Sequence, residues 1–395
     1  MNNTIKLAVA SALLAAASTA SAGILIPAGD WTVDLGGNMN AFITDTKSKT
    51  DGVKNPTSNT IGTGLLPSAI SIGAKTRQND LDVSFNFAFW TGTSSGNNAI
   101  DGGAAGNNSL NIRQAYLTFG DASWGSITAG RNLGIYGSDA ILSDMTLLGV
   151  GVGGPAGGSS TLGRIGSGYI YADWKGQVSY ASPNFNGFSF TGGVMENFRP
   201  AGTVGAPGAS YGDADVTTAS TKDMAFEGKV AYDLAAGDIT GRAWASAISQ
   251  KTKSIDGLTA YTSSGFDVGA KASAAGFGIV GYYYDGRGLD GQNVLGGLFN
   301  ASGEKTNDKG GYVQGTFTVP GAGTKLGVSY GENNSRSEVA GDFSYKNESW
   351  MVGAYHPLTK HLNLVAEYVD QKKTEKVADT QTKTKTMSLG AILFF

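Results

Sequence analysis

The stretch Leu81–Thr91 reads LDVSFNFAFWT, with apolar side chains at each odd position from 81 to 89. The even positions 82–88 carry Asp, Ser, Asn and Ala. Because successive side chains of a β-strand point to opposite faces, this alternation predicts a strand between an apolar and a polar environment. A shift by one residue would exchange the two faces, so the pattern also fixes the orientation of the strand.

The same alternation recurs in about sixteen segments of roughly ten residues. They lie near residues 31–43, 68–77, 80–91, 110–120, 123–131, 172–181, 186–197, 222–234, 237–250, 261–274, 276–285, 309–319, 322–333, 345–356, 361–372 and 384–395. Short links alternate with long Gly/Asn/Ser/Thr-rich loops near 44–67, 91–109, 132–171, 198–221, 286–308 and 334–344. This order predicts an up-and-down meander that closes into a barrel, because an even strand count leaves no edge.

The composition excludes several classes of protein. Among 395 residues, 60 Gly and 9 Pro occur without a G-X-Y period, which excludes a collagen. A hydrophobic content of 41% argues against disorder, and a net charge of -3 gives no basic surface for nucleic acid. With no Cys and two His, neither disulfides nor a Cys/His zinc centre can form, and we expect no cofactor.

Residues 1–22 have the pattern of a cleaved signal peptide. Lys6 precedes an apolar run over Leu7–Ala17, and Ala20-Ser21-Ala22 forms an A-x-A cleavage site. This run is too short to span about 30 Å of hydrocarbon, and residues 23–395 contain no apolar run of about 20 residues. We therefore expect one domain, 23–395, that crosses the inner membrane and is not retained there.

The width of the barrel decides which face meets which environment. About sixteen strands enclose a lumen too wide for side chains to fill, so it holds water. The polar face carries opposite charges in mid-strand, which we interpret as the pairs Asp267 with Lys271 and Glu227 with Lys229. The apolar face then points to lipid, where a charge at the midplane would cost roughly 2–4 kcal/mol. We expect interfacial aromatic girdles from Trp31, Trp90, Trp174, Trp350, Tyr116 and Tyr180.

The predicted fold class is all-β, a transmembrane antiparallel β-barrel; a soluble β-sandwich with an aromatic core is the alternative. Alternation assigns lumen charges of both signs in equal number. The cations are Lys75, Arg77, Arg113, Lys175, Lys229, Arg242 and Lys271, and the carboxylates are Asp34, Asp82, Asp173, Glu227, Asp233, Asp267 and Glu367. Neither sign dominates, so the lumen as a whole should steer one ion class only weakly.

No enzyme motif has the context that its chemistry requires. The glycines of 149–154 satisfy G-x-G-x-x-G, but no strand-to-helix unit surrounds them. His356 and His361 flank a turn, and Asp80 with Asp82 lacks the further ligands of a metal site. We expect no enzymatic activity.

A loop of about 40 residues follows the strand near 123–131, longer than a compact barrel needs. If residues 132–168 fold into the lumen, Asp139 and Asp144 come to lie opposite the wall residues Arg113 and Arg164. Opposed charges would create a transverse field that discriminates solutes by charge and dipole. The alternative is that these loop charges are simply solvated.

Several motifs, in order, resemble the trimeric general diffusion porins of Gram-negative outer membranes. They are Val33-Asp34-Leu35-Gly36-Gly37, Arg113-x-Ala115-Tyr116, Gly130-Arg131-Asn132-x-Gly134, Gly163-Arg164-Ile165-Gly166 and the terminal Phe395. The turn motifs Ser179-Tyr180-Ala181-Ser182-Pro183 and Gly353-Ala354-Tyr355-x-Pro357-Leu358-Thr359-Lys360 are similar to those of the beta-proteobacterial branch.

The resemblance implies that Arg113 and Arg164 belong to a basic wall cluster and that Asp144 is an acidic loop residue. Asn38 and Ser71 stand where relatives carry Lys and Arg, so we expect a weak transverse field and modest ion selectivity. Further lumen-lining candidates are Ser71, Lys75, Arg77, Asn38 and Arg131. The resemblance also implies a homotrimer, contacts with outer-membrane lipids and lipopolysaccharide, and Phe395 as a signal to the barrel assembly machinery.

The predicted function is a water-filled outer-membrane channel for passive diffusion of small hydrophilic solutes and ions. One alternative is a substrate-specific channel for a sugar, phosphate or organic acid, which would need a lumen stripe of aromatics or a ladder of cations. A secreted β-rich adhesin would need a short repeat, and the segments share no fixed period. A barrel lipase or protease would need a suitably placed His.

Overall fold

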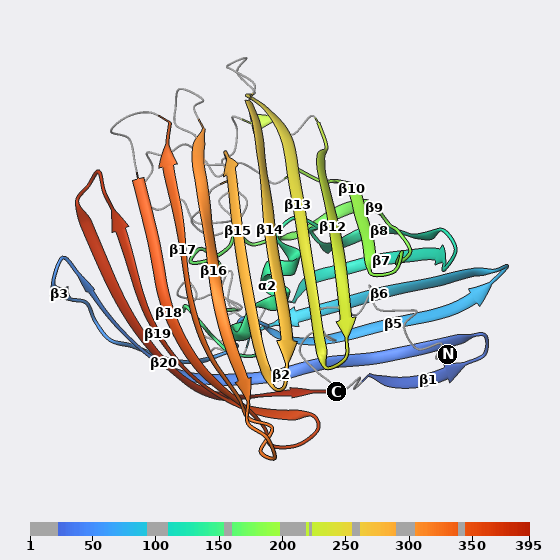
Figure 1. Cartoon of the computed structure of the whole chain (residues 1–395), viewed down its shortest axis with the longest axis horizontal. Coiled ribbons are helices and arrows are strands. Elements are labelled where there is room, and N and C mark those ends of the chain that lie inside the picture. Colours follow the sequence, from blue (N-terminus) through green and yellow to red (C-terminus); the bar gives the residue numbers. More distant parts are fainter. Residues whose placement is uncertain are drawn as a thin grey trace, which may run out of the picture.

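The computed structural model describes residues 23–92, 110–153, 160–197, 219–220, 223–254, 261–289, 305–338 and 344–395. The predicted signal peptide, 1–22, lies outside these residues. Sixteen long antiparallel strands form the wall (Figure 1). They are β2 (Trp31–Thr50), β5 (Ser68–Gln78), β6 (Leu81–Thr91), β7 (Asn111–Asp121), β8 (Gly125–Leu133), β9 (Trp174–Ala181), β10 (Phe188–Met195), β12 (Ala225–Ala236), β13 (Ile239–Ser254), β14 (Tyr261–Ala274), β15 (Phe277–Arg287), β16 (Thr306–Thr318), β17 (Lys325–Ser337), β18 (Ser344–Pro357), β19 (Leu362–Glu375) and β20 (Thr380–Phe394).

The wall closes where the last strand pairs with the first long one. β20 pairs with β2 from Phe394 opposite Asn38 to Thr382 opposite Thr50. At the end of this seam the backbone of Phe395 exchanges two hydrogen bonds with Gly37, of 2.8 and 3.1 Å. The predicted closed, sixteen-stranded antiparallel barrel is confirmed.

Short elements complete the described structure. β1 (Ile24–Ala28) pairs with β2 beyond the end of β20, along the same edge of β2. β3 (Val53–Lys54) and β4 (Ser58–Gly62) fold back and pair with the C-terminal half of β2, and β11 (Ala219–Ser220) pairs with β13. A helix, α2 (Ser138–Ser143), and a 3-10 turn, Met145–Leu148, follow β8. No helix in the described part of the chain is long and apolar enough to span a membrane.

Tight two-residue turns join neighbouring strands at the end of the barrel that has the short links. Asn79 and Asp80 both have positive φ, 48° and 62°, which is typical of the two-residue hairpin turn whose twist matches the strands. Ala275 and Gly276 repeat this conformation at the same end. The predicted alternation of short and long links holds with two differences. The region 44–67 is not a simple loop, because it contains the end of β2 together with β3 and β4, and at the same end only residues 376–379 join β19 to β20.

The outer face is the apolar one. Phe87, Val178 and Leu389 expose 44%, 52% and 60% of their surface on it. At the end with the long links this apolar band stops at Tyr330 and Trp350, whose rings pack at a tilt of 44° with centres 4.8 Å apart. Beyond them, Lys346 forms ion pairs with Glu332 and Glu348, at 3.0 and 2.7 Å.

Two of the aromatic residues predicted for the interfacial girdles, Trp90 and Tyr116, do not lie there. Trp90 and Tyr116 are 4% and 5% exposed, and they share the inner face with Ala88 and Asn86. Their even positions in β6 and β7 place them on the lumen side, so they cannot contact the lipid interface.

We expect Gly390→Val to impair barrel formation. A Cβ atom at Gly390 would come within 2.3 Å of the Ala41 carbonyl oxygen and 2.4 Å of the Phe42 ring, at the closing seam. Overpacking of this kind costs about 1–3 kcal/mol. Gly315→Val is the matched control, since Gly315 faces open space on the outer wall. The readout is the fraction of folded, heat-modifiable barrel on gels, and equal fractions for the two variants would contradict the prediction.

Candidate channel constriction

The link between β8 and β9 comprises residues 134–173, and its described parts, 134–153 and 160–173, are bound to the inner face of the barrel. The predicted bounds, 132–168, were shifted by a few residues, because β8 continues to Leu133 and β9 begins at Trp174. Polar side chains of six strands bind the backbone of this segment, namely Glu227, Asp267, Gln314, Asn333, Asn347 and Glu367. They alternate along their strands with exposed apolar residues such as Val268 and Val328, so they point inward.

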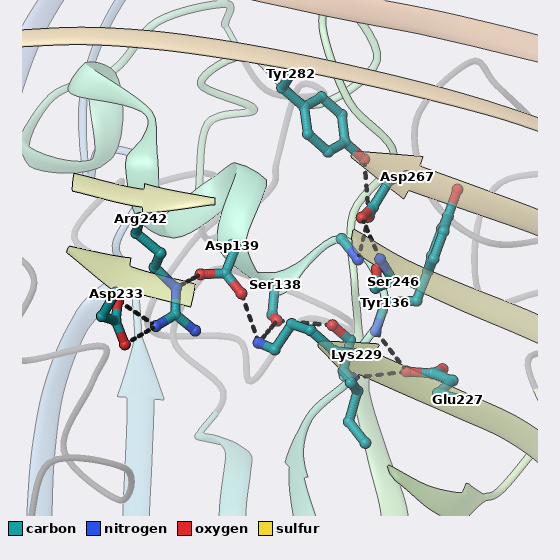
Figure 2. A network of polar contacts seen from close by, with 12 residues as sticks. Tyr136, Ser138, Asp139, Glu227, Lys229, Asp233, Arg242, Ser246, Asp267 and Tyr282 are labelled. Atoms are coloured by element: carbon teal, nitrogen blue, oxygen red, sulfur yellow. Dashed lines mark hydrogen bonds and ion pairs between the residues drawn. The ribbon is translucent and has the colours of Figure 1, made fainter. Parts of the chain in front are cut away.

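Buried carboxylates hold the start of this loop (Figure 2). Glu227 accepts hydrogen bonds from the backbone N–H groups of Ile135 and Tyr136, at 2.6 and 2.9 Å. Its other oxygen forms an ion pair with Lys175. Asp267 accepts from Gly137 N at 3.0 Å, as well as from a backbone N–H of β13 and a tyrosine hydroxyl of β15. These N–H groups have no helix or strand partner, and the carboxylates satisfy them.

The middle of the loop is held in the same way from the other side of the lumen. Glu367 accepts from Val150 N and Gly151 N, at 2.7 and 2.8 Å, and from the Tyr355 hydroxyl at 2.6 Å. Gln314 accepts from Met145 N at 2.7 Å. The loop is therefore fixed to the wall between β12 and β19 over the stretches that the structure describes.

Asp139, predicted for the constriction, lies in α2 and is bound to the wall behind it (Figure 2). Its two oxygens contact Lys229 Nζ at 2.6 Å and Arg242 Nε at 2.8 Å. Burial alone would raise the pKa of this loop carboxylate, but the Lys229 and Arg242 charges outweigh it and hold the pKa below its ordinary value. These ion pairs are complete above the ordinary pKa of Asp and weaken as the pH falls through the lowered one.

Asp144 and Arg164 are both buried, so the prediction that they face each other across open water is wrong. Asp144 accepts from Thr146 N, Arg164 N and the Tyr169 hydroxyl, at 2.9, 3.2 and 2.9 Å. The Arg164 guanidinium donates to the Ser167 carbonyl at 3.0 Å and to the Ser349 hydroxyl at 3.1 Å.

Arg164 was also predicted on the wall, and this too is wrong, because it belongs to the loop between β8 and β9. Its side chain is 0% exposed. It lies in a slot where a Cβ atom at Gly168 or Gly331 would come within 2.6 Å of it. Arg164 therefore packs the loop against β17.

Arg113 reaches the inner face through a β-bulge. Ala88 of β6 pairs with Gln114, whereas Phe89 pairs with Ile112, so Arg113 is the extra residue between them. Its guanidinium lies over the Trp90 ring, 5.4 Å from the centre, and it interacts with Tyr171 of the loop. Without the bulge, Arg113 would share the outer face of Leu117.

The remaining lumen candidates divide into three groups. Lys75 and Arg77 are exposed and lie on the inner face of β5. Asn38 and Ser71 are inward but buried, at 2% and 8% exposure. The prediction that Arg131 lines the lumen is wrong, since this residue pairs with Ala115 and Gly176 on the outer face.

Two of the mid-strand ion pairs expected from the sequence do not form. Glu227 pairs with Lys175 instead of Lys229, and Asp267 binds N–H and hydroxyl groups instead of Lys271. Sequence reasoning assigned these carboxylates to open water and missed their role as loop anchors. No local pattern separates the two cases, because an inward carboxylate has the same alternation in both. The described residues contain no cluster of His, Cys, Asp or Glu that could hold a metal.

A closed wall with an apolar exterior, a polar interior and an internal loop defines a transmembrane β-barrel channel. The sequence profile of the Gram-negative porins matches residues 8–376, and the chain belongs to this family. The family and the fold identify an outer-membrane diffusion channel.

Three solved structures with this fold illustrate the similarity. The outer-membrane channel DcaP of Acinetobacter baumannii has a TM-score of 0.68 at 16% identity, covering 93% of this chain and 99% of its own. An anion-selective porin from Comamonas acidovorans has a TM-score of 0.59 at 17% identity, covering 92% and 100%. OmpF of Salmonella typhi, in complex with daunomycin, has a TM-score of 0.58 at 17% identity, covering 94% and 100%. No curated protein sequence matches the chain.

We expect Glu367→Ala to loosen the loop while leaving the barrel folded. The change removes three hydrogen bonds and leaves two buried N–H groups unsatisfied, each worth about 1–3 kcal/mol. Limited proteolysis followed by mass spectrometry should show cleavage within 134–173 at a rate roughly ten times that of the parent or more. Glu332→Ala, on the outer face, is the control, and equal cleavage in both variants would refute the anchoring role.

Proposed function

We propose that residues 134–173 are the constriction of this channel, through which small hydrophilic solutes and ions diffuse passively and are sorted mainly by size. The observation that carries this proposal is the series of wall side chains, from Glu227 on β12 to Glu367 on β19, that bind the loop backbone. A segment fixed at so many points occupies lumen volume permanently, which a mobile surface loop would not do.

Electrostatic filtering by opposed loop and wall charges has a small part in this proposal. Asp144 and Arg164 are 4% and 0% exposed, and Asp139 is neutralised by the cations behind it. Arg113 is the member of the predicted constriction set that is partly exposed on the inner face. A strong transverse field would require carboxylates facing it across water.

A substrate-specific channel receives little support from the described lumen. Tyr282, Tyr284 and Tyr312 form an aromatic group with ring centres 5.8 to 6.3 Å apart. A sugar-guiding stripe would have to be accessible, but these rings are 6%, 0% and 2% exposed beneath the loop. They pack the loop, and their surfaces are not available to a passing solute.

The assembly and export of the channel are part of the same proposal. We infer cleavage after Ala22, insertion through the barrel assembly machinery with Phe395 as its signal, and contacts with outer-membrane lipids and lipopolysaccharide. We also infer a homotrimer; a solved OmpT structure of Vibrio cholerae with this fold is described as a trimer form.

Planar bilayer recording tests the constriction. The purified protein should give ohmic single-channel steps, and deletion of residues 141–157 should raise the conductance, because it removes loop volume from the lumen. Swelling of proteoliposomes should fall continuously with sugar size and should not saturate. An unchanged conductance in a folded deletion variant would show that the loop does not constrict the channel.

A further inference from the structure

The loop covers more of the negative charges of the lumen than of the positive ones. Of the carboxylates that alternation assigns to the lumen, Glu227, Asp267 and Glu367 are 4%, 1% and 6% exposed and are bound by the loop or its partners. Of the cations, only Lys175 is buried in this way, paired with Glu227. The described lumen that a solute can reach is therefore more positive than the sequence suggests.

The excess is located on the wall beside α2, where Figure 2 shows Lys229 and Arg242 around Asp139. Lys229, Arg242 and Lys271 point inward from the neighbouring strands β12, β13 and β14, with Arg242 directly opposite Lys271 in the register. Their side chains are partly open, 16% for Lys229 and 23% for Arg242. We call these three residues the cationic cluster.

Two carboxylates form ion pairs with the cationic cluster, and both of them bind Arg242. Asp233 accepts two hydrogen bonds from Arg242 Nη1, each of 2.8 Å. Asp139 is shared between Arg242 and Lys229. Lys271 has no carboxylate within 4.0 Å among the described residues, so one positive charge of the cationic cluster is left without an ion-pair partner.

The opposite wall does not offset this charge. On β2 and β5–β7, the cations Lys75, Arg77 and Arg113 are matched in number by Asp34, Asp82 and Asp121. Arg77 is itself bound to two of these carboxylates, at 2.9 Å each. That side is close to neutral, so it does not offset the unmatched charge that Lys271 adds to the cationic cluster.

We propose that the channel prefers small anions, such as chloride and short carboxylates, and that Lys271 in the cationic cluster determines this preference. The inference rests on the proposed channel function and adds the sign of the ions that the channel prefers. A fixed positive charge on a low-dielectric wall raises the local concentration of anions and lowers that of cations. Within about one Debye length of the permeation path, one unpaired charge changes the ratio of chloride to potassium permeability by about twofold or more.

The test is the reversal potential of the full-length protein in planar bilayers under a tenfold KCl gradient. The parent protein should favour chloride. Lys271→Gln should lower the permeability ratio by about twofold, and Lys271→Glu should bring it below one. The control is Lys383→Gln, which removes a positive charge from the exposed outer face of β20 and should leave the ratio unchanged. Heat-modifiable migration verifies that each variant is folded.

The outcomes separate this inference from the function on which it rests. Absence of conductance from the folded parent protein would overturn both. A conducting parent that favours potassium, or a preference for chloride that Lys271→Gln and Lys271→Glu leave unchanged, would overturn the inference and leave the channel function intact. Equal changes in the Lys271→Gln and Lys383→Gln variants would overturn the assignment to Lys271.

Discussion

Backbone hydrogen bonding controls the architecture of this protein. Within hydrocarbon, an unpaired N–H or C=O group costs several kcal/mol, and no water is present to satisfy it. The sheet must therefore have no free edge, which the pairing of β20 with β2 achieves. Closing sixteen strands produces a lumen that side chains alone cannot fill, so the interior needs another occupant to set its width.

The loop that occupies the interior has the same requirement in a different form. Its backbone N–H groups at 135–137, 145, 150 and 151 have no partner within a helix or strand ladder, and the wall supplies acceptors through Glu227, Asp267, Gln314 and Glu367. The position of the loop and the charge of the lumen thus have a common cause. Each carboxylate that anchors the loop is one that no longer faces the permeating ion.

The fold could be predicted from the sequence because alternation is a local signal. β14 was predicted at 261–274 and occupies those residues. The far end of β2 was missed because 44–50, TDTKSKT, is polar on both faces; it is held by contacts such as Thr46 with Thr386, 340 residues away.

The site was less predictable. Spacing marked Asp139 as a loop charge, but its partners Lys229 and Arg242 lie about a hundred residues away, and only the docked loop brings them together. The same limit applies to Asp144 and Arg164, whose burial depends on how the loop packs against β17 and β18.

The bulge at Arg113 shows how such a lumen can diversify. In a two-faced strand, gain or loss of one residue moves every side chain beyond it to the other face unless a bulge absorbs the change. Here the bulge confines that change to one position, which points a cation inward while Leu117 and its neighbours keep their contact with lipid. A single-codon insertion could therefore change which side chains face the lumen without any substitution. Variation among related channels can arise in this way as well as from a change of residue types.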